Sequence, residues 1–320
     1  MRRYTRREAL HAGLLGAGAV ALGGLLEACG KSARVATAGS INKLLQAQKS
    51  AGDKAFQAFL AGEDYVSGVD NYVGIFLAHA GANGTRIFGD NARVWFSPTT
   101  NQDTSFSPTG PVAAPWYAYA HPEAGAATPK GLNAVHFTFD RVGFWTIIVE
   151  TTSGDNLIAT TAVQVKAQGH TDTLIQGQKA HPTVTPTVAN PGNVNPICTR
   201  TPPCTMHQIT LADAIGNGKP TAFIVATPEF CQSRNCGPSL DELITVQAKY
   251  ASQANFVHAE VYLNAQQPSA PNPQLTPAMT EWGLLSEPWL FMIDKTGVIS
   301  SRFEGGFTAG IAEAALKPLL

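Results

Sequence analysis

The chain has no excess of charge of either sign and few groups arranged for chemistry. Its 320 residues include 22 Lys and Arg and 23 Asp and Glu, with no long run of one sign. A nucleic-acid partner would require a clear basic excess, so this balance argues against one. The sequence also lacks a glycine-rich phosphate loop, a serine nucleophile elbow and a paired-carboxylate site, and we predict no cofactor. The five cysteines are the most informative residues that remain.

Residues 1–29 are predicted to be an export signal. A basic region opens the chain, formed by Arg2, Arg3, Arg6 and Arg7. The apolar stretch from about residue 12 to residue 26 is too short and too rich in glycine for a membrane-spanning helix. Residues 5–10 resemble a twin-arginine export motif, and residues 26–29 resemble a bacterial lipobox that ends in Cys29. We therefore expect a lipid on Cys29 that anchors the protein to the extracytoplasmic side of the cell membrane, with an ordinary cleaved signal peptide as the alternative.

The number of cysteines agrees with this interpretation. Five thiols in an exported protein leave one unpaired. If Cys29 carries a lipid, the others form two near pairs, Cys198 with Cys204 and Cys231 with Cys236. Disulfides form and persist outside the cytoplasm, so either pair could be oxidised there.

The middle of the chain is predicted to be a β-sandwich. Residues 30–60 are expected to form a polar tether and a short helix, and residues 61–167 contain repeated apolar runs separated by turn signals. The strand candidates are 72–78, 92–96, 134–139, 143–149 and 161–165. About 100 residues of this kind indicate an immunoglobulin-like domain, without the disulfide of antibody domains because the segment has no cysteine. Residues 168–197, rich in Thr, Pro, Gln and Asn, are predicted to be a linker.

Residues 198–320 alternate between predicted strands and helices, which indicates an α/β domain. A short helix is expected to begin in capping-box style at Thr210, and a last helix is expected to begin at Thr308. The predicted elements between them are a strand at 221–227, a helix at 239–252, and strands at 255–263, 288–293 and 298–303.

This order resembles the thioredoxin fold over about residues 209–320. Residues 287–297 look like the P-x-x-F-x-I-D-x-x-G segment of extracytoplasmic thioredoxin-like oxidoreductases. The resemblance implies that Pro288 has a cis peptide bond and packs beside redox cysteines. The whole chain, a sandwich followed by such a domain, is similar to thioredoxin-domain lipoproteins of actinobacteria.

Cys231 and Cys236 fall between the apolar run 221–225 and the next predicted helix. A helix N-terminus favours a thiolate, so this position suits sulfur chemistry. Thioredoxins have two residues between their cysteines, whereas this chain has four. Positions i and i+5 of a regular helix lie about 7.5 Å apart along the axis, which is beyond disulfide reach. We therefore favour a loop at 231–236 with Pro238 as the first helical residue, and a kinked, earlier helix is the alternative.

The predicted activity is thiol–disulfide exchange with an unidentified client or redox partner protein. Cys231 would attack and Cys236 would resolve the mixed disulfide. One alternative is a thiol peroxidase of the peroxiredoxin-Q type, although Pro228 and Pro288 stand where those enzymes carry a threonine and an arginine. Another is a non-catalytic scaffold lipoprotein in which both cysteine pairs are static disulfides.

Cys198 and Cys204 enclose a short loop that contains two prolines. We predict a structural disulfide there, and a second redox pair that relays electrons to Cys231 is the alternative. No metal site is predicted. A copper site that uses His207 is the weaker interpretation, and His258, inside a predicted strand, is assigned to packing.

Overall fold

The computed structural model describes residues 19–21, 56–79, 86–98, 108–121, 130–152, 157–264, 270 and 272–320. The predicted lipid attachment site Cys29 and the predicted short helix after residue 40 lie outside these ranges. No helix within them is long and apolar enough to cross a membrane. Strand β1 (Ala19–Ala21) lies inside the predicted export signal and pairs antiparallel with β11 (Leu157–Lys166). Part of the predicted export signal thus pairs with the fold, and the export role stays a prediction.

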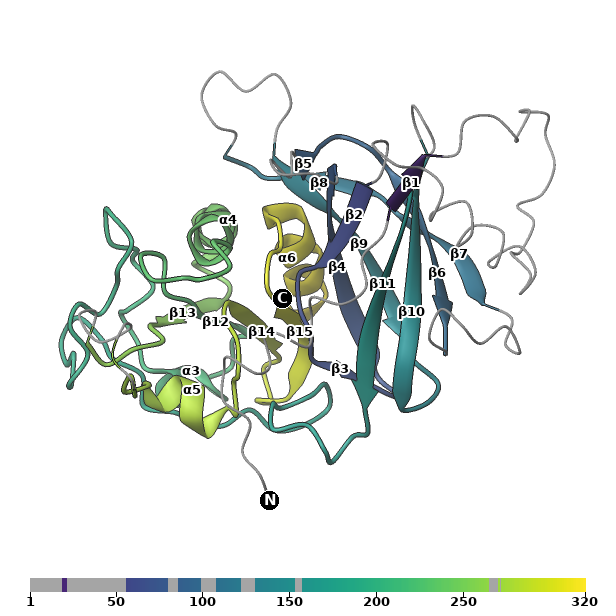
Figure 1. Ribbon diagram of the computed structural model, residues 1–320. Coiled ribbons are helices and arrows are strands. Elements are labelled where there is room, and N and C mark those ends of the chain that lie inside the picture. Colours follow the sequence, from purple (N-terminus) through teal and green to yellow (C-terminus); the bar gives the residue numbers. More distant parts are fainter. Residues whose placement is uncertain are drawn as a thin grey trace.

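Two sheets packed face to face form the first part of the molecule, here called the sandwich (Figure 1). One sheet has the order β1-β11-β10-β6-β7, with β3 beside β11, and the other has the order β2-β4-β9-β8, with β5 beside β4. The strands are β2 (Phe56–Leu60), β3 (Tyr65–Val66), β4 (Asp70–His79), β5 (Arg86–Ile87), β6 (Ala92–Ser97), β7 (Thr109–Ala114), β8 (Trp116–Ala118), β9 (Gly131–Thr138) and β10 (Gly143–Thr151). The predicted start at residue 61 is wrong, because β2 already pairs with β4 at residues 56–60.

A four-stranded sheet with helices on both faces forms the second part, here called the α/β unit. Its order is β13-β12-β14-β15, with β13 parallel to β12 and the other two pairs antiparallel. The strands are β12 (Thr221–Val225), β13 (Asn255–Ala259), β14 (Trp289–Ile293) and β15 (Ile299–Glu304). The helices are α3 (Leu211–Ala214), α4 (Cys236–Tyr250), α5 (Pro277–Glu281), α6 (Ala309–Leu316) and the 3-10 helix η2 (Lys317–Leu319).

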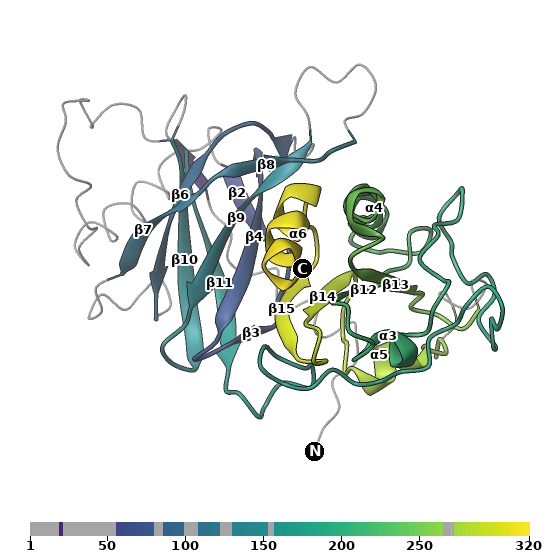
Figure 2. The same cartoon turned by 180° about the vertical axis from the view of Figure 1, so that it is seen from behind.

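Alternation along the strands places helices on both faces of this sheet. Ala222 and Ile224 of β12 pack in the apolar cluster that includes α4 and α6, whereas Phe223 and Val225 pack with α3 and α5. Figure 2 shows the two pairs of helices on opposite faces of the sheet. Both parts are therefore rich in sheet, and among the described residues the helices lie in the second part.

The sequence predicted the starts of two helices correctly and the start of α4 incorrectly. The side chains of Thr210 and Thr308 accept N–H groups of their own helices, as predicted. Helix α4 begins at Cys236, so Pro238 is its third residue and the predicted first position is wrong. Helix α5 was not expected.

The predicted linker, residues 168–197, is extended but lies against the α/β unit. Lys179 bridges to Val298, and the Thr183 carbonyl accepts the Ala212 N–H. Thr185 is buried and accepts the N–H of Leu211 through its hydroxyl. This segment is therefore part of the packed unit rather than a free spacer.

One apolar cluster contains residues of both the sandwich and the α/β unit. Tyr72 and Phe76 of β4 pack in the same cluster as α4 and α6, and the Tyr72 hydroxyl donates to the Gly306 carbonyl at 2.8 Å. Both views place α6 between β4 and α4 (Figures 1 and 2). At the same junction Gly305 has φ +77°, and a Cβ there would lie 1.8 Å from the Ala61 carbonyl oxygen, so only glycine fits. The two parts are therefore held in a fixed relation.

A buried ion pair crosses this junction. Arg302 of β15 donates to the Asp64 carboxylate at 2.8 Å and to the Asp64 carbonyl at 2.9 Å, and Lys166 reaches the same carboxylate at 2.8 Å. Burial alone would raise the pKa of Asp64, but the two cations outweigh burial and lower it. Nearby, Glu304 accepts the N–H groups of Glu63 and Asp64, each at 2.6 Å.

Replacing Arg302 tests this ion pair. We expect Arg302→Met to lower the free energy of unfolding by about 3 kcal/mol, because Asp64 would be left buried without its main partner. Arg141→Met removes an exposed ion pair with Asp140 and should change stability little. Denaturant unfolding of both variants measures the difference, and equal effects would contradict a special role for the buried pair.

Candidate functional site

The turn between β12 and α4 brings two thiols together at a helix N-terminus. The apolar run 221–225 forms a fully buried strand, and the chain then turns without regular structure until α4 begins at Cys236. Cys231 lies in this turn, and its sulfur accepts the Cys236 N–H with an N···S distance of 3.2 Å. The predicted loop is thus present at residues 231–235, but Cys236 already belongs to α4 and Pro238 is the third helical residue. Both thiols are free.

The two thiols have opposite acidities. Hydrogen bonding from the Cys236 thiol, with smaller contributions from the Ser233 hydroxyl and from the Cys236 backbone N–H, outweighs burial and lowers the pKa of the half-buried Cys231 to about 5. Burial, followed by the neighbouring Cys231 sulfur, raises the pKa of the fully buried Cys236 far above its ordinary value. At neutral pH, therefore, Cys231 is a thiolate and Cys236 holds its proton. A reachable thiolate beside a protonated, buried thiol can attack a disulfide and then resolve the product.

The third predicted residue, Pro288, lies at the same place. The Glu287–Pro288 peptide bond is cis, as the resemblance implies. Ser233 of the thiol turn donates to the Glu287 carbonyl at 3.4 Å, so the segment that carries Pro288 lies beside the two cysteines. The predicted thiol site is thus assembled from the turn after β12 and the segment before β14.

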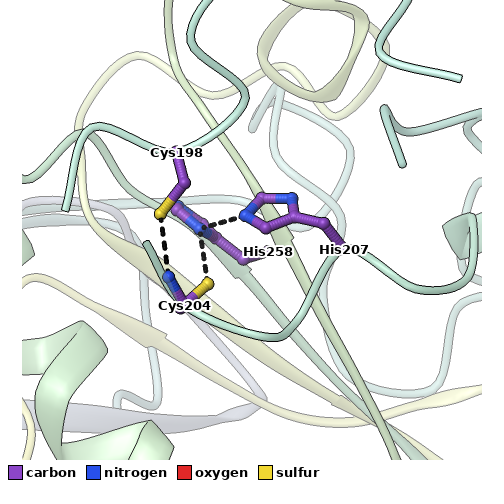
Figure 3. A group of neighbouring side chains, drawn as sticks. All are labelled: Cys198, Cys204, His207 and His258. Atoms are coloured by element: carbon purple, nitrogen blue, oxygen red, sulfur yellow. Dashed lines mark hydrogen bonds between the residues drawn. The ribbon is translucent and has the colours of Figure 1, made fainter. Parts of the chain in front are cut away.

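Cys198 and Cys204 do not form the predicted disulfide, because both are free thiols. They lie instead with His207 and His258, and one donor atom of each residue falls within 4.8 Å of the others (Figure 3). The Cys204 sulfur lies 3.4 Å from His258 Nδ1, and that nitrogen lies 3.1 Å from His207 Nε2. The Cys204 N–H points to the Cys198 sulfur at 3.4 Å. We refer to these four residues as the Cys–His cluster.

The surroundings of the Cys–His cluster link it to the thiol turn. His258 lies in β13, and its Nε2 is 3.1 Å from the carbonyl of Ala226, the residue that follows β12. Thr199 donates its N–H to Glu260 at 2.6 Å, and its hydroxyl accepts the Glu229 N–H at 3.2 Å. The loop that begins at Cys198 is therefore fixed both to the end of β13 and to the turn that carries Cys231.

The pKa values of the four side chains in the Cys–His cluster are shifted in different directions. Hydrogen bonding from Cys204 lowers the pKa of Cys198, while the same bond raises that of Cys204. Burial lowers the pKa of His207, so its ring is neutral at pH 7. Burial also opposes a charge on His258, but hydrogen bonding to Cys198 and the charge of Glu260 outweigh it and raise its pKa.

The sequence interpretation found the cysteines of this cluster but assigned His258 to packing. The missed signal is a histidine inside an otherwise apolar strand, paired in register with Ile224 of β12. Burial at that position requires a polar partner. The three other members fall within residues 198–207, so one non-local contact completes the set.

No protein-family model matches the chain, and no curated protein matches its sequence. The resemblance to thioredoxin-like proteins therefore depends on the motifs described above. Function has to be argued from the geometry of the site.

The acidity of Cys231 can be tested by alkylation. We expect the rate of its reaction with iodoacetamide to be constant above about pH 7 and to fall with an apparent pKa of about 5, because only the thiolate reacts. Cys236→Ala should move this pKa upward, toward about 8.5. Mass spectrometry of the peptide that carries Cys231 follows the reaction, and a half-maximal rate near pH 8.5 in the unchanged protein would contradict the prediction.

Proposed function

We propose that this protein is a membrane-anchored, extracytoplasmic thioredoxin-like protein that exchanges thiols and disulfides with a partner protein through Cys231 and Cys236. The observation that carries the proposal is the hydrogen bond from the Cys236 N–H to the Cys231 sulfur at the start of α4. It joins a half-buried thiol of low pKa to a fully buried thiol of high pKa. A thiol-exchange site needs this division of roles.

The arrangement of the α/β unit supports the thioredoxin-like assignment. Its sheet order β13-β12-β14-β15, with β14 and β15 antiparallel to their neighbours, agrees with the resemblance. The cysteine turn follows β12, and the cis proline precedes β14. The two facing sheets before it are compatible with an immunoglobulin-like domain. The anchor would be a lipid on Cys29, at the membrane's extracytoplasmic surface.

The exchange is a two-step transfer. The Cys231 thiolate attacks one sulfur of the partner's disulfide, forms a mixed disulfide and releases the other partner sulfur as a thiolate. The Cys236 thiol then gives up its proton and attacks the Cys231 sulfur, which releases the second partner thiolate. The partner gains two electrons, and its two released thiolates take up one proton from Cys236 and one from solvent. This protein ends with a Cys231–Cys236 disulfide. The reverse sequence would oxidise the partner.

Oxidised glutathione provides a direct test. The reduced protein should form the Cys231–Cys236 disulfide and release two reduced glutathione molecules, because Cys236 resolves the intermediate. Cys236→Ser should stop after one glutathione is released and should keep the other bound to Cys231. Mass spectrometry of the intact chain distinguishes the two products.

Cys231→Ser is the matched control and should neither bind glutathione at position 236 nor form a disulfide there, because Cys236 is buried. A mixed disulfide that persists on Cys231 of the unchanged protein would show that Cys236 does not resolve it. That result, or no reaction at Cys231, would favour the scaffold interpretation.

A further inference from the structure

Outside the thiol site, the Cys–His cluster is the densest group of potential metal ligands among the described residues. Three of its members come from one short segment: Cys198, Cys204 and His207. His258 comes from the middle of β13. All four donor atoms converge although no covalent bond joins them (Figure 3).

Hydrogen bonds within the Cys–His cluster do not give each of its polar atoms a partner of its own. His258 Nε2 faces the Ala226 carbonyl and donates to it, so Nδ1 is the ring nitrogen turned toward the cluster. Both the Cys204 sulfur and His207 Nε2 face this one nitrogen, at 3.4 and 3.1 Å. The far nitrogen of His207, Nδ1, is buried without a hydrogen-bond partner. A cation at the centre would use the inward-facing atoms of all four residues at once.

Two spacings between donor atoms are close to those of a tetrahedral metal site. Zinc lies about 2.3 Å from thiolate sulfur and about 2.0 Å from imidazole nitrogen. A tetrahedron with these bonds has nitrogen–nitrogen edges of about 3.3 Å and sulfur–nitrogen edges of about 3.5 Å. The observed distances of 3.1 Å between the two histidine nitrogens and 3.4 Å between Cys204 and His258 are close to these values.

We propose that Cys198, Cys204, His207 and His258 bind one Zn²⁺ ion in a closed structural site. Two sulfurs and two imidazoles suit zinc, whereas calcium and magnesium require oxygen ligands. Binding replaces the two thiol protons, which leave to solvent, and the two thiolates neutralise the ion. Four protein ligands leave no position for water or substrate, which is the mark of a structural rather than a catalytic site.

The position of the site means that the ion would join two segments of the chain. Its ligands connect the loop at 198–204 to β13, and the hydroxyl of Thr199 in this loop accepts the Glu229 N–H. Glu229 lies two residues before Cys231. The zinc site therefore stabilises the turn that carries the reactive thiol, and it keeps Cys198 and Cys204 from pairing with each other.

Zinc content of matched variants tests the proposal. The full-length chain with Cys29→Ser is reduced, incubated with Zn²⁺, freed of excess metal and analysed by inductively coupled plasma mass spectrometry. We expect one zinc ion per chain, and its loss in Cys198→Ser and in His258→Ala. The double variant Cys231→Ser/Cys236→Ser removes two thiols of the same unit and should retain one zinc ion. Zinc that is absent from the unchanged chain, or that depends on Cys231 and Cys236, would overturn the proposal.

Two further measurements use the chain with all four metal ligands unchanged. They therefore decide the proposal even if Cys198→Ser or His258→Ala does not fold. Co²⁺ in place of Zn²⁺ should give the intense visible bands of a tetrahedral thiolate site, whereas weak octahedral bands would overturn it. Zinc should also protect Cys198 and Cys204 from iodoacetamide while Cys231 still reacts, and a chelator should remove that protection. Equal alkylation with and without zinc would overturn the proposal.

Discussion

The hydrogen bond between the Cys236 N–H and the Cys231 sulfur is the interaction on which the functional account depends. It exists because α4 begins at Cys236 and not earlier, which leaves Cys231 in a turn that folds back over the first N–H groups of the helix. A helix that began five residues earlier would place both cysteines on the helix, too far apart to react. The start of α4 therefore determines both the acidity of Cys231 and its distance from Cys236.

The rest of the molecule holds this helix in place. Glu242 of α4 accepts the Ala120 N–H of the sandwich at 2.7 Å and the Ala309 N–H at the start of α6 at 2.6 Å. Tyr72 and Phe76 extend the core of α4 and α6 into β4. The sandwich thus supplies one wall of the core on which α4 lies.

The α/β unit carries two pairs of cysteines with different surroundings. Cys231 and Cys236 have a helix N-terminus and no nearby imidazole among their hydrogen-bond partners, whereas Cys198 and Cys204 face two histidines.

Local signals in the sequence predicted much of the fold, and contacts between distant segments account for what they missed. Strand β12 and the caps at Thr210 and Thr308 were predicted because each depends on a few neighbouring residues. Strand β7 was missed because it contains glycine, proline and two alanines, and β8 was missed because it has only three residues. The disulfide between Cys198 and Cys204 was wrong because spacing alone cannot show that His207 and His258 meet the same sulfurs. The thiol site was predictable because its cysteines follow a recognisable strand, while the Cys–His cluster needed the register between β12 and β13.

The reduction potential of the Cys231–Cys236 pair tests the central claim most directly. The protein is equilibrated in glutathione buffers of known potential, its thiols are alkylated, and the oxidised fraction of this pair is measured by mass spectrometry. The low pKa of Cys231 stabilises the reduced form, so the account predicts a midpoint between about −270 and −120 mV, the range of thiol-exchange proteins. A pair that stays oxidised below about −300 mV would be a static disulfide and would contradict the account.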